Sequence, residues 1–134
     1  PAGSQLLRDL YIDWYTEQGL NHTLIPFDGR SDYDGFIRAG IPAGGIATGA
    51  EGIKTAEEEA MFGGEQGDWY DPNYHQIGDD LTNLNHTAWE VNTRLIAHSV
   101  GTFAASFEGF PKRTTEFRAT KVKPTKYRGH KLIM

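Results

Sequence analysis

The chain has 134 residues, a net charge of −5 and no cysteine. This length fits a single domain, and sixteen aromatic residues exclude a fully disordered chain. No run approaches the roughly 20 apolar residues of a membrane span, so we expect no membrane insertion. The absence of cysteine excludes a disulfide framework, a thiol nucleophile and a Cys-based zinc site.

The first predicted elements are a helix and a short strand. Apolar residues at helical spacing predict a helix from Ser4 to Gln18 that Gly19 ends. Its apolar stripe consists of Leu6, Leu7, Leu10, Tyr11, Trp14 and Tyr15. The run from Leu24 to Phe27 predicts a strand, which Pro26 restricts to a strand end or a sheet edge.

A second helix and a second strand follow. The spacing of Ser31 and Asp34 resembles a capping box and predicts a short helix through Ala39. Residues 41–48 predict a buried strand, in which Gly44 and Gly45 allow another backbone or a ligand to come close.

The remaining elements are two helices separated by a long loop. Thr55 and Glu58 form a second predicted capping box, for a helix that ends near Gly63. Residues 63–84 have no sustained period, and a loop of that length is usually functional. Thr87 and Glu90 are predicted to cap the last long helix. The apolar residues predicted to share one face of it are Trp89, Ile96, Val100, Phe103 and Phe107.

Helices that alternate with short, continuously apolar strands predict an α/β sandwich with a largely parallel sheet. Two strands are too few for such a sheet. We therefore expect this chain to be the end of a larger α/β domain.

Charge divides the chain into an acidic part and a basic tail. Residues 1–110 contain five basic and seventeen acidic residues, whereas residues 111–134 contain eight basic residues and Glu116. An acidic surface repels phosphate, so we expect no nucleic-acid partner. We expect the tail instead to lie across an acidic surface.

The loop at residues 69–80 contains the most informative candidate residues. It holds Tyr74 and His75 together with several carboxylates. Neutral imidazole is the commonest metal ligand, and a neighbouring phenol can stabilise an oxyanion. The alternative is a surface histidine among helix-capping aspartates. The other histidines form no metal-binding pair, so any further ligands must come from other sequence.

A second candidate cluster lies at the junction of residues 27–33. It places Arg30 and Ser31 where a strand is predicted to meet a helix, a position that lines ligand crevices in open α/β sheets. Equally, Arg30 could pair with a local carboxylate beside a capped helix. No Gly-x-Ser-x-Gly elbow surrounds Ser31, which argues against a nucleophilic serine. Separately, Asn21 and Asn85 begin Asn-x-Thr triplets and are candidate glycosylation sites.

Several motifs in order along the chain resemble those of secreted two-zinc aminopeptidases, the leucyl aminopeptidase-like enzymes of bacteria and fungi. The resemblance extends over about residues 1–110. The matching segments are Gly29-Arg30-Ser31-Asp32-Tyr33, Gly40-Ile41-Pro42-Ala43-Gly44-Gly45, Thr48-Gly49-Ala50-Glu51, Tyr74-His75 and Thr82-Asn83-Leu84-Asn85.

The resemblance implies a three-layer α/β/α fold with a mostly parallel central sheet, of which this chain is the C-terminal half. It implies two zinc ions per complete site, with His75 as one ligand and Tyr74 as the residue that stabilises the tetrahedral intermediate. Gly29 and Arg30 match the stretch beside the substrate's free amino group. Ala47 and Thr48 match part of the side-chain pocket.

The activity implied is metal-assisted release of N-terminal, leucine-like residues from peptides. The catalytic Glu base and the other zinc ligands belong to the N-terminal half. We therefore expect a cleaved, secreted enzyme in which an N-terminal partner chain supplies them, and no activity from this chain alone. Residues 111–134 would then be a propeptide-like tail. Within it, Lys112-Arg113 is a dibasic pair of the kind that secretory processing enzymes cut, although a basic tail can also contain such a pair by chance. The alternative is a non-catalytic module that keeps the fold without zinc.

Two positions depart from the family pattern. Some relatives have cysteines that form a small disulfide around the Tyr-His pair, where this chain has Asn73 and Gly78. We expect packing, through Trp69 and Tyr70, to hold the loop instead. Ala47 replaces a frequent Phe, which puts the leucine preference in question.

Overall fold

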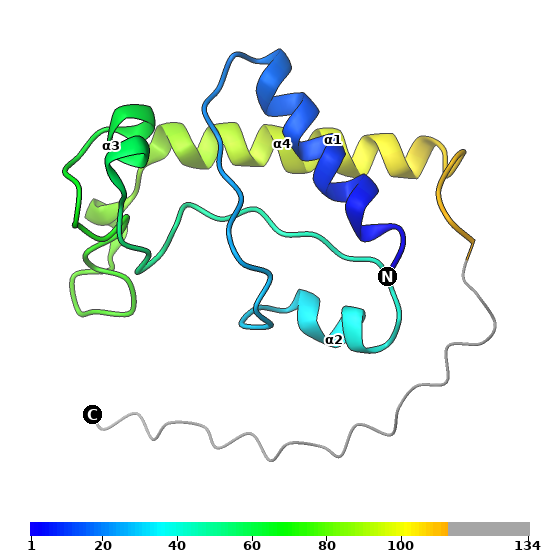
Figure 1. Cartoon of the computed structure of the whole chain (residues 1–134), viewed down its shortest axis with the longest axis horizontal. Helices are drawn as coiled ribbons and strands as arrows, with labels where there is room; N and C mark the ends of the chain where they lie inside the picture. Colours follow the sequence, from blue (N-terminus) through cyan, green and yellow to red (C-terminus); the bar gives the residue numbers. More distant parts are fainter. Residues whose placement is uncertain (113–134) are drawn as a thin grey trace.

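The computed structural model describes residues 1–112. In chain order they form α1 (Ser4–Glu17), α2 (Tyr33–Arg38), α3 (Ala56–Phe62), the 3₁₀ turn η1 (Leu81–Asn83) and α4 (His86–Ala105). Figure 1 shows α1 crossing the long α4, with extended segments connecting the shorter helices. None of the helices among these residues is long and apolar enough to span a membrane. Residues 113–134, most of the predicted basic tail, lie outside the described part.

The predicted first helix is confirmed with nearly the expected bounds. Gly19 has a φ of 66°, a left-handed conformation that glycine adopts without a steric penalty. The backbone N–H of Gly19 donates to Thr16, and that of Leu20 donates to Tyr15. These bonds use carbonyl groups that the end of α1 would otherwise leave unpaired, which explains why the helix stops there.

Of the described elements, α1 and α4 are the two that pack against each other. The Tyr15 hydroxyl donates to Asn92 Oδ1 at 2.6 Å, and burial raises the pKa of Tyr15. Leu95 is completely buried, and Ser99, one turn later, is also buried. The packed side of α4 is therefore narrow.

The apolar stripe expected on α4 lies on a different side of the helix. Trp89 is 61% exposed and Val100 is 64% exposed, and Ile96 and Phe107 are exposed as well. Only the edge of the stripe is covered, where Phe103 packs edge-on against Phe110 at 5.4 Å. Within residues 1–112, α4 thus leaves most of its apolar stripe without a partner.

One of the three predicted capping boxes is confirmed. Thr55 Oγ1 accepts from the Glu58 backbone, and the Glu58 carboxylate accepts from the Thr55 backbone at 2.8 Å. The box predicted from Ser31 is wrong because α2 begins after Asp32 and has no side-chain cap. The box predicted from Thr87 is also wrong. The side chain of Asn85 caps α4 by accepting from Ala88.

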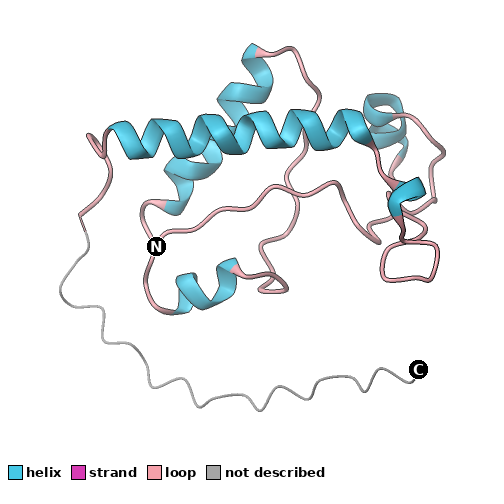
Figure 2. Ribbon diagram, turned by 180° about the vertical axis from the view of Figure 1, so that it is seen from behind, coloured by secondary structure: helices cyan, strands magenta, loops and turns pink. Residues whose placement is uncertain are grey.

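The predicted α/β class with a parallel sheet is wrong for the described residues. Figure 2 contains no strand, and the one β-type pairing in residues 1–112 is an isolated antiparallel bridge between Ile53 and Trp69. The apolar segments 24–27 and 41–48 are extended but form no ladder with each other. A strand needs a neighbour to pair its backbone groups, and an apolar composition alone does not supply one.

Residues 41–45 pack against α1 instead of against a strand. A Cβ atom on Gly44 would lie 3.1 Å from the Tyr11 ring and 3.3 Å from Leu7 Cβ. The Ala43 backbone donates to Ser4 Oγ at 3.1 Å. The close approach expected at Gly44 is therefore made by a helix.

Candidate functional site

The turn that carries Gly29 and Arg30 is held by Asp28 and Tyr33. Gly29 has a φ of 85°, and its backbone N–H donates to the Tyr33 hydroxyl at 2.8 Å. That hydroxyl donates in turn to Asp28 Oδ1 at 3.3 Å. The Tyr33 ring stacks on Phe27 with a centroid separation of 3.7 Å. The junction of residues 27–33 is thus a closed network rather than a loose linker.

Two carboxylates hold the Arg30 guanidinium. Its Nε donates to Asp28 Oδ2 at 2.8 Å, and its Nη1 pairs with Glu51 Oε1. The hydrogen bonds that Arg30 donates to Glu51 and to Asp28, the first having the larger effect, raise the pKa of Arg30. The Arg30 backbone N–H and its guanidinium lower the pKa of Asp28, and the same guanidinium lowers the pKa of Glu51. The alternative in which Arg30 pairs with local carboxylate is therefore what the structure contains, and it does not exclude a role in binding.

Glu51 lies in a tight turn that is joined to the loop with Tyr74 and His75. Gly52 N–H donates to the Gly49 carbonyl at 2.9 Å, which closes the turn. The carbonyl groups of Ala50 and Gly52 accept from Asp71 and Tyr70, each at 2.9 Å. Ala50 itself has a φ of 50°, a conformation uncommon outside glycine. These bonds connect the Arg30 cluster to the loop that follows residue 70.

The Tyr70 ring fills the space beside this turn. A Cβ on Gly49 would lie only 2.3 Å from Tyr70 Cγ, so the contact requires glycine. Burial, and then the neighbouring Glu58 carboxylate, raise the pKa of Tyr70 to about 12. Tyr70 therefore supports the turn as a neutral side chain at ordinary pH.

Polar side chains hold the loop around Asn73 and Gly78. Asp71 Oδ1 accepts from the Asn73 backbone at 2.9 Å and from the Asn83 amide at 3.0 Å. The Asn73 amide donates to Asn83 Oδ1 at 2.7 Å. A Cβ on Gly78 would lie 2.5 Å from Asn73 Oδ1, so these two positions are in contact. Packing by Tyr70 contributes as expected, whereas Trp69 is 42% exposed.

Tyr74 and His75 lie at the outer part of this loop. Their rings stack with a centroid separation of 3.9 Å, and His75 has a φ of 56°. The His75 side chain is exposed. The imidazole is therefore available to a metal ion. However, residues 1–112 contain no group of three or more His, Asp or Glu that could hold one, so they supply a single ligand and not a complete site.

The remaining predicted residues occupy separate surfaces. Ala47 and Thr48 are exposed and directly precede the Gly49 turn. The Asn21 amide donates to the Met61 carbonyl at 2.7 Å, and Asn85 caps α4 through its oxygen. Both asparagines are exposed. Arg30, the Gly49 turn and the His75 loop are thus joined, whereas Asn21 and Asn85 lie elsewhere.

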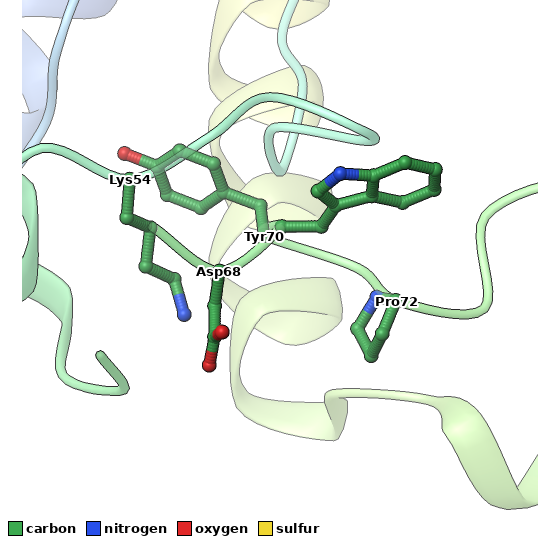
Figure 3. Close-up of a pocket in the computed structure, with 5 residues that line it drawn as sticks. Lys54, Asp68, Tyr70 and Pro72 are labelled. Atoms are coloured by element: carbon green, nitrogen blue, oxygen red, sulfur yellow. The ribbon is translucent and has the colours of Figure 1, made fainter. Parts of the chain in front are cut away.

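Sequence reasoning did not single out a shallow cavity of about 520 Å³ beside the Ile53–Trp69 bridge. Figure 3 shows its lining, which consists of Lys54, Asp68, Trp69, Tyr70 and Pro72. Lys54 Nζ lies 5.7 Å from the centre of the Tyr70 ring, a cation–π distance. Lys54 is the first lysine of the chain, and this isolated cation in an acidic segment was the available signal. The lining includes neither Arg30 nor His75.

Comparison with known proteins shows the family. The model described as "Peptidase family M28" matches residues 2–100. The chain belongs to peptidase family M28. All the candidate residues, from Asn21 to Asn85, fall within the matched part.

Curated relatives in the M28 comparison are named as aminopeptidases. The chain is 55% identical over 116 residues to aminopeptidase Y of Saccharomyces cerevisiae, which covers 87% of this chain and 20% of that protein. It is 48% identical over 115 residues to a probable leucine aminopeptidase 2 of Aspergillus oryzae, covering 86% and 23%. For leucine aminopeptidase 2 of Trichophyton equinum the identity is 50% over 113 residues, covering 84% and 23%. The M28 chain therefore spans about a fifth of the length of these relatives.

Proposed function

We propose that this chain is one part of a secreted zinc aminopeptidase that removes N-terminal, leucine-like residues from peptides. The main support for this proposal is that the chain belongs to family M28 and shares about 50% sequence identity with proteins named as aminopeptidases. In this proposal the chain supplies His75, Tyr74 and the Arg30 turn. An N-terminal partner chain from the same precursor supplies the other zinc ligands and the Glu base.

His75 and Tyr74 are the proposed catalytic contribution. His75 would hold zinc through an imidazole nitrogen, and its exposed ring fits that role. Bound zinc would polarise the first peptide carbonyl as a Lewis acid. The Tyr74 hydroxyl donates a hydrogen bond to the oxygen of that carbonyl as negative charge develops on it. Such a bond accelerates the reaction because it is strongest in the transition state.

The turn at residues 28–33 and the exposed pair Ala47 and Thr48 form the proposed substrate contacts. Gly29 has a φ of 85° and lies against the Asp34 carboxylate, which a Cβ would approach to 3.1 Å, so glycine gives the turn beside Arg30 its shape. Ala47 and Thr48 are small and exposed, so they leave room for the first side chain of the substrate.

The proposed partner chain covers apolar surface of this chain. Leu95 is the one fully buried large side chain in residues 1–112. By contrast, the stripe residues other than Phe103 are more than half exposed, as are Leu24, Ile25 and Phe27. Apolar surface of this extent usually marks an interface. We define the assembled complex as this chain together with that partner.

Secretion and glycosylation are part of the proposal. Asn21 is exposed in the segment that follows α1, and Asn85 is exposed directly before α4. A glycan is tolerated at such exposed positions. Asn85 caps α4 with Oδ1 and leaves Nδ2, the atom to which a glycan attaches, unused among the described hydrogen bonds. A mass shift on both asparagines, removed by a glycosidase, is the expected result.

Hydrolysis of leucyl anilide by the assembled complex tests the function. We expect activity and its loss on treatment with a chelator. We also expect at least about a 100-fold reduction by His75→Ala, because losing only an outer-shell partner of a metal ligand already costs about 10- to 100-fold. His98→Ala is the matched control because His98 is exposed on α4, away from the candidate site. Equal activity of His75→Ala and His98→Ala contradicts the assignment of His75.

Metal content and substrate form separate the enzyme from its alternatives. We expect about two zinc ions per complex, as in two-metal hydrolytic sites, and no hydrolysis of N-acetyl-leucyl anilide. A complex that folds without zinc and without activity would be a non-catalytic binding module. Cleavage of the blocked substrate would indicate a peptidase that does not require a free N-terminus.

A further inference from the structure

Arg30 is held in one orientation by two carboxylates from different segments. Asp28 binds Nε from within the same turn, and Glu51 binds Nη1 from a turn 21 residues away. Among the described residues, Nη2 has no partner. The guanidinium therefore presents one remaining nitrogen to a ligand, with its plane fixed by the other two.

The pair with Glu51 differs from an ordinary surface ion pair. The Arg30 side chain is 68% exposed, but that of Glu51 is only 32% exposed, and the second oxygen of Glu51, Oε2, is buried with no hydrogen-bond partner among the described residues. By contrast, Glu90 and Arg94 on α4 are 65% and 71% exposed at an N–O distance of 2.6 Å. Because water is excluded from one side of Glu51, its attraction for Arg30 is screened less.

The backbone around Glu51 is also fixed. The Gly49–Gly52 turn is closed by a hydrogen bond of 2.9 Å, and Ala50 and Gly52 accept from Asp71 and Tyr70. Glu51 therefore joins the Arg30 turn to the loop with Tyr74 and His75. A carboxylate in this position sets where the guanidinium lies relative to that loop.

We propose that Glu51 is a positioning residue for substrate binding, which acts by holding Arg30 so that Nη2 meets an oxygen of the bound peptide. This inference rests on the proposed function. A guanidinium has donors and no acceptor, so its partner on a peptide is a carbonyl or carboxylate oxygen and not the N-terminal ammonium. Glu51 touches no substrate in this arrangement.

The test uses the assembled complex with a leucyl tripeptide as substrate and four proteins: wild type, Glu51→Gln, Arg30→Ala and the double variant. Glu51→Gln keeps the size of the side chain and removes its charge. We expect Glu51→Gln to raise KM about tenfold and to change kcat less than about twofold. The reason is that Arg30 is no longer held in place, so its charge-assisted hydrogen bond to the peptide is lost. Arg30→Ala raises KM at least as much, and adding Glu51→Gln to it has no further effect because Glu51 acts through Arg30.

Glu90→Gln is the matched control, since it removes one carboxylate from the exposed pair on α4. Its KM and kcat remain those of wild type. Effects of Glu51→Gln and Arg30→Ala that multiply in the double variant overturn the inference, as does an unchanged KM in Glu51→Gln. Loss of assembly by Glu51→Gln, seen as a lower Tm or a dissociated complex, overturns it too because the role would then be structural. If the wild-type complex is active and any of these occurs, the proposed function stands and only this inference falls. An inactive wild-type complex contradicts both.

Discussion

At the turn before Glu51, Gly49 combines two requirements that only glycine meets. Its φ of 110° disfavours any other residue, and a Cβ would lie 2.3 Å from the Tyr70 ring. Gly19 meets only the first requirement, because its φ is 66° and no atom lies within 4 Å of its Cβ position. Comparing substitutions at Gly49 and Gly19 therefore distinguishes the cost of backbone strain from the cost of overlap with a neighbouring side chain.

We expect Gly49→Ala to destabilise the assembled complex more than Gly19→Ala does. Gly19→Ala should cost about 1 kcal/mol of unfolding free energy from backbone strain alone. Gly49→Ala should cost about 1–3 kcal/mol more because the Tyr70 ring must move. Denaturant midpoints measure both. In a Tyr70→Ala background, Gly49→Ala should cost less unfolding free energy than it does in the wild type, whereas the cost of Gly19→Ala should be the same in both. Equal costs of the two glycine substitutions in the wild type would contradict the packing argument.

Of the two short α-helices, α3 is the one whose beginning is specified by its own side chains. Thr55 and Glu58 exchange side-chain and backbone hydrogen bonds, and three consecutive glutamates lie in the first turn. Negative charge near a helix N-terminus is favourable because it interacts with the helix dipole. α2 has no comparable cap, although Ser31 precedes it.

The caps predict that removing a side-chain hydroxyl before α3 speeds amide exchange, whereas removing one before α2 does not. Thr55→Ala should destabilise α3 by about 1 kcal/mol, which speeds amide exchange at residues 56–59. Ser31→Ala should leave exchange in α2 unchanged, because Ser31 makes no side-chain cap bond there. Hydrogen exchange of the assembled complex measures both helices at once. A larger increase in exchange in α2 on Ser31→Ala than in α3 on Thr55→Ala would indicate that the caps are assigned to the wrong residues.

For the whole molecule, the exposed stripe of α4 gives the sharpest prediction. Val100 is 64% exposed in this chain alone, and we expect the partner chain to cover it. Val100→Asp should then weaken assembly about tenfold or more, because burying a valine side chain contributes about 1.5–3 kcal/mol. The α1–α4 contact around Leu95 should be unaffected.

His98→Asp is the control for that experiment. It places the same charge on α4 on the side away from Val100, at an exposed position. Titration of the labelled partner measures both dissociation constants. If Val100→Asp binds the partner as tightly as His98→Asp does, the α4 stripe is not the interface.

How far the site was predictable depends on the range of the contacts. The Tyr74-His75 pair and Arg30 were singled out because their chemistry is readable from residue type and from the family resemblance. Glu51 was quoted only as part of a motif, since nothing near it in the sequence identifies Arg30 as its partner. Lys54 and Asp68 were missed because the cavity they line forms only when residues 52–54 meet residues 68–70.

The sequence by itself determined the helices, the stop at Gly19, the cap at Thr55 and the family. The helices, the stop and the cap depend on interactions between residues three or four positions apart, which any local segment contains, whereas the family depends on the order of motifs along the chain. Tertiary structure alone decided that residues 24–27 and 41–48 form no ladder, that Leu95 rather than the Trp89 stripe is buried, and that Glu51 holds Arg30. The physical reason is that hydrogen bonds of a strand, burial of a helix face and a long-range ion pair each need a second segment, whose position no local pattern specifies.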